Sequence, residues 1–339
     1  MKAIEVIRPG EMHIAEIPDC GRPAAGEAIV RMKSAGICGS DLHIYNGHSA
    51  FAVYPNIMGH ELAGEVVEVG EGVADLRKGD RVAVNNVLSC GACYACSIGR
   101  PNVCREVKVL GVHVEGGYKQ YLKINARHLY KFSERVPWEH AALIEPYSIA
   151  AQVIDRGRLT VSDRVLICGA GPLGLIILQA VKRQGVQVAV LDRVASRLER
   201  AAALGADLVI DTTTDSVQEA ILNFTNREGA SLIVESTGSI AVLEMCVRDL
   251  ASQAGRIVVL GFPKQSAQIS PFDMMRRELD LIGSRLNNEQ FPTAIAWMEQ
   301  GEVDPGAIIS HRFRFEQAKA AMDFINEKPD EVLKVVLQF

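Results

Sequence analysis

The second half of the chain alternates short apolar runs with segments of helical periodicity. From Arg164 onward the apolar runs are RVLICGA, VQVAVLD, LVI, SLIVEST, GRIVVLG and LDLIGS, and helical patterns separate them. The first two predicted helices, Pro172–Gln184 and Ala195–Leu204, are each followed by a glycine, the residue preferred just past a helix end. Such alternation predicts right-handed strand–helix–strand units and a doubly wound parallel sheet.

The first part of the chain has a different pattern. Short apolar or alternating segments, such as Ala28–Met32, Leu62–Val69 and Arg81–Asn85, are separated by glycine-rich breaks. This pattern predicts a mostly antiparallel β-domain with long loops. After Ser284 the chain becomes helical and irregular, and it ends in the strand-like EVLKVVLQF, which we expect to rejoin the first domain.

The predicted fold is therefore α/β with two domains. A mostly β domain comprises residues 1–148 and 286–339, and a doubly wound domain comprises residues 149–285. The length of 339 residues agrees with two domains, because single cores rarely exceed about 250–300 residues.

Charge and hydropathy exclude several classes of partner. The net charge of −5 gives no electrostatic basis for binding nucleic acid or an anionic membrane. The sequence has no apolar run near the roughly 18 residues of a membrane span and no signal-peptide pattern at its start. We therefore expect a cytoplasmic protein with no membrane partner.

A glycine-rich turn between a predicted strand and helix indicates a dinucleotide site. Gly169, Gly171 and Gly174 have the G-x-G-x-x-G spacing, and Pro172 suits the first turn of the helix that follows. The helix N-terminus, which includes Leu173, would face the pyrophosphate with its positive dipole end.

An acidic residue at the end of the second strand favours NAD. Asp192 is placed to accept hydrogen bonds from the adenosine ribose and to repel a 2′-phosphate. Arg193 and Arg197 weaken the inference, because they could bind that phosphate, cover the adenine or remain solvated. Four further residues end the fourth and fifth strands, where such sheets meet their ligands, and we expect them beside the cofactor: Thr237, Gly238, Leu260 and Gly261.

Four of the eight cysteines lie in one short segment. Cys90, Cys93, Cys96 and Cys104 provide four thiolates from a single loop, a set that closes a tetrahedral zinc site. In a reducing compartment such a cluster indicates a structural metal site rather than a disulfide framework.

A second candidate metal site is scattered along the first domain. Cys38 in GICGSDLH, His60 and Glu61 in MGHELAGEV, and Glu145 in LIEPYS make a mixed set that can leave a zinc position open for substrate. Their spacing alone does not bring these residues together.

Together these motifs resemble the medium-chain, zinc-containing dehydrogenase family, over the whole chain and in the family's order. The resemblance implies a GroES-like catalytic domain around an inserted Rossmann domain, with the active site between them. It implies that Cys38 and His60 bind catalytic zinc, with Glu61 or Glu145 completing the shell directly or through water. Ser40 would pass the proton of the alcohol toward the nicotinamide ribose, and His43 would carry it to solvent. Two zinc ions per chain, NAD and a homodimer or homotetramer are also implied.

The glutamate at 145 stands where liver-type alcohol dehydrogenases have a cysteine. It resembles the branch of sorbitol, threonine and sugar-acid dehydrogenases. The stretches HIYNGHSAFAVYP, CSIGRPNVC, LGVHVEGGY and GSRLN resemble the hexonate 5-dehydrogenases (L-gulonate, L-galactonate or L-idonate type) and the starvation-sensing dehydrogenases close to them. The resemblance implies oxidation of a sugar acid at a secondary hydroxyl such as carbon 5.

A sugar acid needs polar groups for its hydroxyls and a cation for its carboxylate. Arg285, just past the last strand of the doubly wound domain, is the candidate cation and would also border the cofactor. His48 and Asn287 are candidate polar contacts, and Tyr45 and Phe51 are candidate walls. A neutral polyol or L-threonine remains an alternative substrate. A non-catalytic sensor of NAD and zinc is an alternative of another class, although it would need neither Ser40 nor His43.

Overall fold

The structure, a computed structural model, describes residues 1–261 and 263–339. It divides into two compact units. Unit 1 comprises Met1–Ser148 and Asn287–Phe339, and unit 2 comprises Ile149–Leu286. Each has its own buried apolar core.

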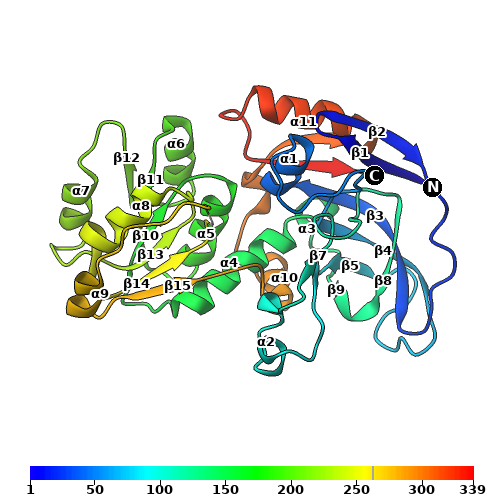
Figure 1. Cartoon of the computed structure of the whole chain (residues 1–339), viewed down its shortest axis with the longest axis horizontal. Helices are drawn as coiled ribbons and strands as arrows, with labels where there is room; N and C mark the ends of the chain where they lie inside the picture. The colour runs from blue at the N-terminus through cyan, green and yellow to red at the C-terminus, as the bar shows by residue number, and fades with distance from the viewer. Residues whose placement is uncertain (262) are drawn as a thin grey trace. The chain divides into compact units, whose positions relative to one another are not determined.

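Unit 2 is built on a six-stranded sheet in which every neighbouring pair is parallel. Its strands are β10 (Arg164–Cys168), β11 (Gln187–Asp192), β12 (Leu208–Asp211), β13 (Ala230–Glu235), β14 (Ala251–Val259) and β15 (Asp280–Gly283). The spatial order is β12-β11-β10-β13-β14-β15, which the labels in Figure 1 follow. This order, with its reversal beside the first strand, is the doubly wound arrangement that the sequence predicts.

Helices connect these strands. They are α5 (Pro172–Lys182), α6 (Ala195–Ala203), α7 (Val217–Phe224), α8 (Ile240–Met245), the π-helix Cys246–Leu250 and α9 (Pro271–Arg277). The central strands β10 and β13 are almost continuously buried, as expected for parallel strands that helices cover on both faces.

Unit 1 is mostly antiparallel β-structure. Its main sheet has the order β16-β17-β3-β4-β5-β9, and β8 also pairs with β3. The bounds of these strands are β3 (Glu27–Ile37), β4 (Glu61–Val69), β5 (Arg81–Val84), β8 (Tyr121–Asn125), β9 (Leu129–Lys131), β16 (Ile309–Arg314) and β17 (Lys334–Gln338). Two small sheets pair β1 (Lys2–Arg8) with β2 (Glu11–Glu16) and β6 (Val87–Leu88) with β7 (Lys108–Val109).

The helices of unit 1 are short, and one continues into unit 2. They are α1 (Gly39–Tyr45), α2 (Tyr94–Ser97), α3 (Trp138–Ala141), α4 (Ile144–Gly157), α10 (Phe291–Glu299) and α11 (Ala318–Glu327), with 3-10 turns at Pro101–Val103, Ala126–His128, Pro305–Ala307 and Phe315–Gln317. Across the described residues, no helix has both the length and the apolar character that a membrane crossing requires.

The C-terminal tail joins the N-terminal part of the chain through strand pairing. Strand β17, red in Figure 1, pairs antiparallel with the blue β3, with Val335 opposite Ile37 and Gln338 opposite Ser34. This pairing brings Lys334 to the end of β3 from which Cys38 follows.

Candidate functional site

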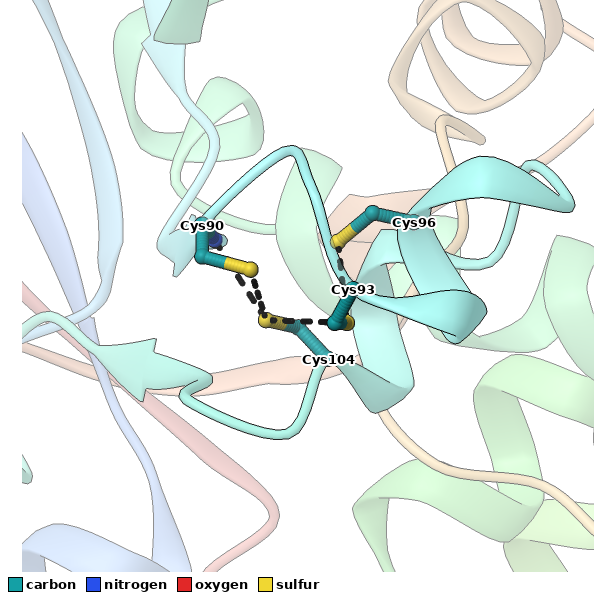
Figure 2. Close-up of side chains that lie close together, drawn as sticks. All are labelled: Cys90, Cys93, Cys96 and Cys104. Carbon is teal, nitrogen blue, oxygen red and sulfur yellow. Dashed lines mark hydrogen bonds between the residues drawn. The ribbon is translucent and has the colours of Figure 1, made fainter.

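The four cysteines of the loop converge. Their Sγ atoms are 3.4 Å apart between Cys90 and Cys104, 3.6 Å between Cys93 and Cys96, and 3.8 Å between Cys93 and Cys104 (Figure 2). The backbone N–H groups of Cys90 and Glu106 each donate to the Cys104 sulfur over 3.3 Å. Four sulfurs within ligand distance of one another fit a closed tetrahedral zinc site.

Backbone donors favour the thiolate form that binds zinc. N–H groups of Arg105 and Cys96 lower the pKa of the Cys93 thiol to about 6. Burial, by contrast, raises the pKa of Cys96 to about 11, so a bound metal would displace its proton.

The second group assembles where β3 and β4 pair. Cys38 follows β3 and precedes α1, while His60 and Glu61 lie at the start of β4. The ligand atoms of Cys38, His60 and Glu61 all lie within 4.8 Å of one another. Gly36 pairs with Glu61, and a Cβ at that glycine would lie 1.9 Å from the Glu61 carboxylate, so only glycine fits beside it.

His60 is held by a carboxylate that the sequence reasoning missed. Its Nδ1 lies 3.5 Å from Oδ1 of Asp41, while its Nε2 lies 3.3 Å from the Ser40 hydroxyl. Burial opposes charge on His60, but the Asp41 carboxylate and the Cys38 thiolate raise its pKa well above the ordinary value. Asp41 is in the third position of α1, where an acidic side chain often caps the helix. That position is the sequence signal that could have identified Asp41.

Glu61 forms a buried ion pair with Lys334. The ammonium lies 2.6 Å and 2.9 Å from the two carboxylate oxygens, and the lysine is 5% exposed. Burial lowers the pKa of Lys334, but the charge of Glu61 outweighs it and the pKa is raised. The two residues are 273 positions apart, and nothing in the local sequence indicates the contact.

Glu145 lies near this group without belonging to it. It lies in the first turn of α4, and its Oε1 accepts a hydrogen bond of 2.9 Å from the Asn86 amide. Burial raises the pKa of Glu145 to about 7 against the opposing charge of His60, and the negative charge of Glu61 contributes to the increase. Of the two candidate carboxylate ligands, the structure places Glu61 with Cys38 and His60.

The charges of this group fit a bound cation. Three buried carboxylates, Asp41, Glu61 and Glu145, lie near His60, and the buried ammonium of Lys334 pairs with one of them, Glu61. Buried charges require compensation, so a soft dication bound by sulfur and imidazole suits the donor set. In addition, Oδ1 of Asp41 and Nδ1 of His60 face each other at 3.5 Å, and neither atom has a hydrogen-bond partner among the described residues, as in carboxylate–histidine–zinc arrangements.

The candidate relay residues differ in exposure. Ser40 is half-buried beside His60, and His43 is exposed on α1, with its ring centre 6.3 Å from that of His48. His48 is exposed, and Phe51 is 57% exposed with its ring 5.1 Å from His113. The exposure of His43 suits proton exchange with solvent.

Two predicted substrate contacts are buried instead. Tyr45 is 3% exposed, and its hydroxyl donates to Asp323 over 2.8 Å, so it packs α1 against α11 rather than lining an open pocket. Asn287 is 1% exposed and donates to Asn85 over 3.4 Å. We therefore withdraw both from the candidate substrate pocket. Arg285 is exposed after β15.

The glycine-rich turn has the geometry that the spacing predicts. Gly169 has a φ of +102°, and Gly171 precedes α5 with open space where a Cβ would be. A Cβ on Gly174 would lie 1.9 Å from the Gly169 carbonyl oxygen, so the third glycine allows close packing of helix and strand. Pro172 and Leu173 form the first turn of α5.

Asp192 is tied to this turn. One of its oxygens accepts from the Ala170 N–H over 2.7 Å, and the other accepts from the N–H groups of Arg193 and Val194 over 2.7 and 3.0 Å. A carboxylate has about four acceptor positions, so these three bonds leave capacity for a ribose hydroxyl. Arg193 is exposed, and Arg197 is half-buried and already in contact with the protein.

A buried glutamate orders the turns after β13 and β14, which the sequence predicts to lie beside the cofactor. Oε1 of Glu235, at the end of β13, accepts from the N–H groups of Thr237 and Gly238 over 2.8 and 3.1 Å, and its carbonyl accepts from Leu260 N–H over 2.9 Å. A Cβ on Gly261 would lie 2.3 Å from the Gly238 Cα, so the turns interlock. The sequence reasoning missed Glu235, although an acid inside an apolar strand is a signal.

Two family models match the chain. Residues 24–134 match the alcohol dehydrogenase GroES-like domain, and residues 172–300 match the zinc-binding dehydrogenase domain. The chain belongs to the medium-chain, zinc-type alcohol dehydrogenase family. The family, the fold class and the enzyme class expected from the sequence are thereby confirmed.

Relatives of this zinc-type dehydrogenase match it over nearly its whole length. Starvation-sensing protein RspB of Escherichia coli K12 is 41% identical, covering 100% of this chain and 99% of the relative. L-galactonate-5-dehydrogenase of the same strain is 32% identical, with 94% and 93% covered. Sorbitol dehydrogenase of Bacillus subtilis is 33% identical, with 92% and 90% covered.

A solved structure carries the cofactor. The alcohol dehydrogenase rspB of E. coli CFT073, in complex with NADH, is 40% identical, with a TM-score of 0.93 and coverage of 100% of this chain and 99% of that one. The zinc-type family, this NADH-bound relative and the two groups of candidate ligands confirm zinc and NAD as the cofactors of this dehydrogenase.

Proposed function

We propose that this dehydrogenase oxidises a secondary hydroxyl of a small polyhydroxylated substrate at the centre formed by Cys38, His60 and Glu61. One observation supports this most directly: a thiol, an imidazole and a carboxylate converge. Among the described residues, the buried carboxylates around them outnumber the one buried ammonium, that of Lys334, which pairs with Glu61. When bound there, zinc supplies a Lewis acid that lowers the pKa of a substrate hydroxyl.

Different side chains around the centre accept, hold and release the proton of the substrate hydroxyl. Ser40, beside His60, is the proposed acceptor of the hydroxyl proton, and exposed His43 passes it to water. Glu145, whose pKa is raised to about 7, can hold or release a proton near neutral pH. We therefore assign Glu61 to the metal shell and Glu145 to a proton-holding position beside it.

On the cofactor side, we propose that Gly169, Gly171 and Gly174 admit the pyrophosphate and that Asp192 accepts from the adenosine ribose. Thr237, Gly238, Leu260 and Gly261 border the nicotinamide half at the carboxyl ends of their strands.

We propose a sugar acid as the substrate, oxidised at carbon 5 of an L-gulonate- or L-galactonate-type hexonate. Support comes from the relative named L-galactonate-5-dehydrogenase and from the exposed Arg285, a cation suited to a carboxylate. His48 and Phe51 are exposed on the loop after α1 and are further proposed substrate contacts. The relative named sorbitol dehydrogenase is just as similar, so a neutral polyol is the second candidate, with L-threonine beside it.

The substrate test is comparative. We expect kcat/KM to be higher for L-gulonate, L-galactonate or L-idonate than for sorbitol, galactitol or L-threonine. Arg285→Ala should lower the ratio of acid to polyol, whereas Arg22→Ala, which removes another exposed arginine, should leave it unchanged. A preference for a polyol or threonine would refute the sugar acid, and an unchanged ratio would refute the role of Arg285. No turnover across the panel with zinc-loaded protein would favour the sensor.

We also propose a homodimer or homotetramer. Strand β15 is at the edge of its sheet, and Phe272, Met275 and Leu281 on α9 and β15 are exposed apolar side chains. Pairing of β15 with a second copy would extend the sheet and cover them. Light scattering that gives a monomer at working concentration would refute this. Because four thiols bind zinc only when reduced, we place the protein in the cytoplasm, which cell fractionation would check.

A further inference from the structure

Tyr118 is a fully buried tyrosine that lies directly behind the metal-binding segment. Its backbone N–H donates to the Met58 carbonyl over 2.9 Å, and the N–H of Gly117 donates to the Gly59 carbonyl over 2.9 Å. A Cβ on Gly59, the residue before His60, would lie 2.2 Å from the Tyr118 ring. The ring therefore occupies the space that glycine leaves beside His60.

The hydroxyl of Tyr118 has a separate role from the ring. It lies 2.9 Å from Oδ2 of Asp41 and 2.9 Å from the Gly36 carbonyl oxygen. Packing of the ring and the backbone bonds would be complete with phenylalanine at this position. The hydroxyl is thus an added polar group, and its one proton has two acceptors, of which the carboxylate is the stronger.

The Asp41 carboxylate is oriented by these contacts. Oδ2 accepts from Tyr118 and from the Cys38 N–H over 2.9 Å, which leaves Oδ1 facing Nδ1 of His60 at 3.5 Å. Nε2 of the imidazole then faces the Ser40 hydroxyl at 3.3 Å, and the ligand atoms of His60 and Cys38 lie within 4.8 Å of each other. Burial and the neighbouring Asp41 raise the pKa of Tyr118 well above its ordinary value, so the hydroxyl remains a donor at any working pH.

We propose that Tyr118 is a positioning residue for the zinc ligand His60, and that its hydroxyl acts through Asp41. It fixes the rotation of the carboxylate, and the carboxylate holds the imidazole with Nε2 directed to the metal position. The inference rests on the proposed catalytic zinc at Cys38, His60 and Glu61. Partners of metal-bound histidines change metal affinity by about 10–100-fold when they are lost.

The test uses Tyr118→Phe, which keeps the ring and removes the hydroxyl. We expect the affinity of the catalytic zinc, measured by chelator competition, to fall about tenfold. The d–d absorption bands of the cobalt(II)-substituted catalytic site should also shift. Tyr121→Phe is the matched control, because Tyr121 lies on β8 near Arg31 and is half-exposed. It should change neither readout.

A double-mutant cycle separates positioning from packing. In an Asp41→Asn background, Tyr118→Phe should change zinc affinity by much less than in the wild type, because its effect passes through that carboxylate. An unchanged zinc affinity with a lower Tm, or the same loss in both backgrounds, would refute the role of Tyr118. A wild-type protein that binds only the four-cysteine zinc would overturn the catalytic site and this inference together, so the two failures are distinguishable.

Discussion

The buried ion pair between Lys334 and Glu61 predicts that Lys334→Met destabilises unit 1 in a metal-dependent way. Methionine retains much of the length of lysine but leaves the Glu61 carboxylate, 1% exposed, without its cation. Removal of one partner of a buried pair typically costs about 3–5 kcal/mol. Burial raises the pKa of Glu145, and the negative charge of Glu61 adds to the increase, so these surroundings already disfavour further buried negative charge. We expect about 3 kcal/mol in metal-free protein at neutral pH.

With catalytic zinc bound, the loss should fall to about half, because the dication supplies positive charge beside the same carboxylate. Urea unfolding followed by tryptophan fluorescence measures both values. The two tryptophans, Trp138 and Trp297, are both in unit 1, so the signal reports the unit that contains the ion pair. Variant and wild type are compared at the same metal loading.

The control is Lys319→Met. Lys319 pairs with Asp323 over 2.6 Å, but its side chain is 54% exposed and solvent screens the pair, so its loss should cost far less than the loss of Lys334, with or without metal. A loss below 1 kcal/mol for metal-free Lys334→Met, or an equal loss in the two metal states, would refute the reasoning.

Three further predictions concern other side chains. Burial raises the pKa of Glu145 from 4.5 to about 7, so its contribution to stability is full below pH 4.5 and is lost as the pH rises through about 7. Glu145→Gln should therefore flatten that part of the Tm–pH profile of metal-free protein, and parallel profiles for variant and wild type would contradict this. Cys96→Ser should remove one zinc and lower Tm, whereas Cys38→Ser should abolish activity but retain the fold and NADH binding. If metal analysis finds only one zinc per chain, and Cys38→Ser still holds it, the proposed catalytic zinc site is excluded. Asp192→Ala should lower kcat/KM for NAD and narrow the preference over NADP, and a wild-type preference for NADP would contradict the assignment.

The Rossmann unit could be predicted because its information is local. Each strand is an apolar run, each helix has its own periodicity, and the glycine-rich turn needs only neighbouring residues. Strand β14 is the exception, since it begins at Ala251 rather than at the predicted Gly255. The earlier start includes Ala254 with a φ of +53° and a register shift against β13, neither of which an apolar pattern reveals.

The candidate site could be predicted only in part. Family resemblance brought Cys38, His60 and Glu61 together, whereas spacing alone did not. Lys334 was missed, because its contact depends on the pairing of β17 with β3. Tyr45 was placed wrongly, because a sequence does not show that a tyrosine hydroxyl already has a carboxylate partner on another helix.

The two metal groups lie in different structural contexts, and their metals should therefore support the fold differently. The α2 segment of the four-cysteine loop has no buried residue, and Tyr94 within it is 80% exposed, so little apolar burial holds this loop together. By contrast, Cys38, His60 and Glu61 adjoin β3 and β4, strands whose core would pack without a metal. Loss of the loop zinc should thus unfold a segment, because metal binding supplies its folding free energy. Loss of the catalytic zinc should instead leave a folded unit that carries uncompensated buried acids. The excess of buried negative charge destabilises that unit without metal, and the same charge favours the binding of a dication.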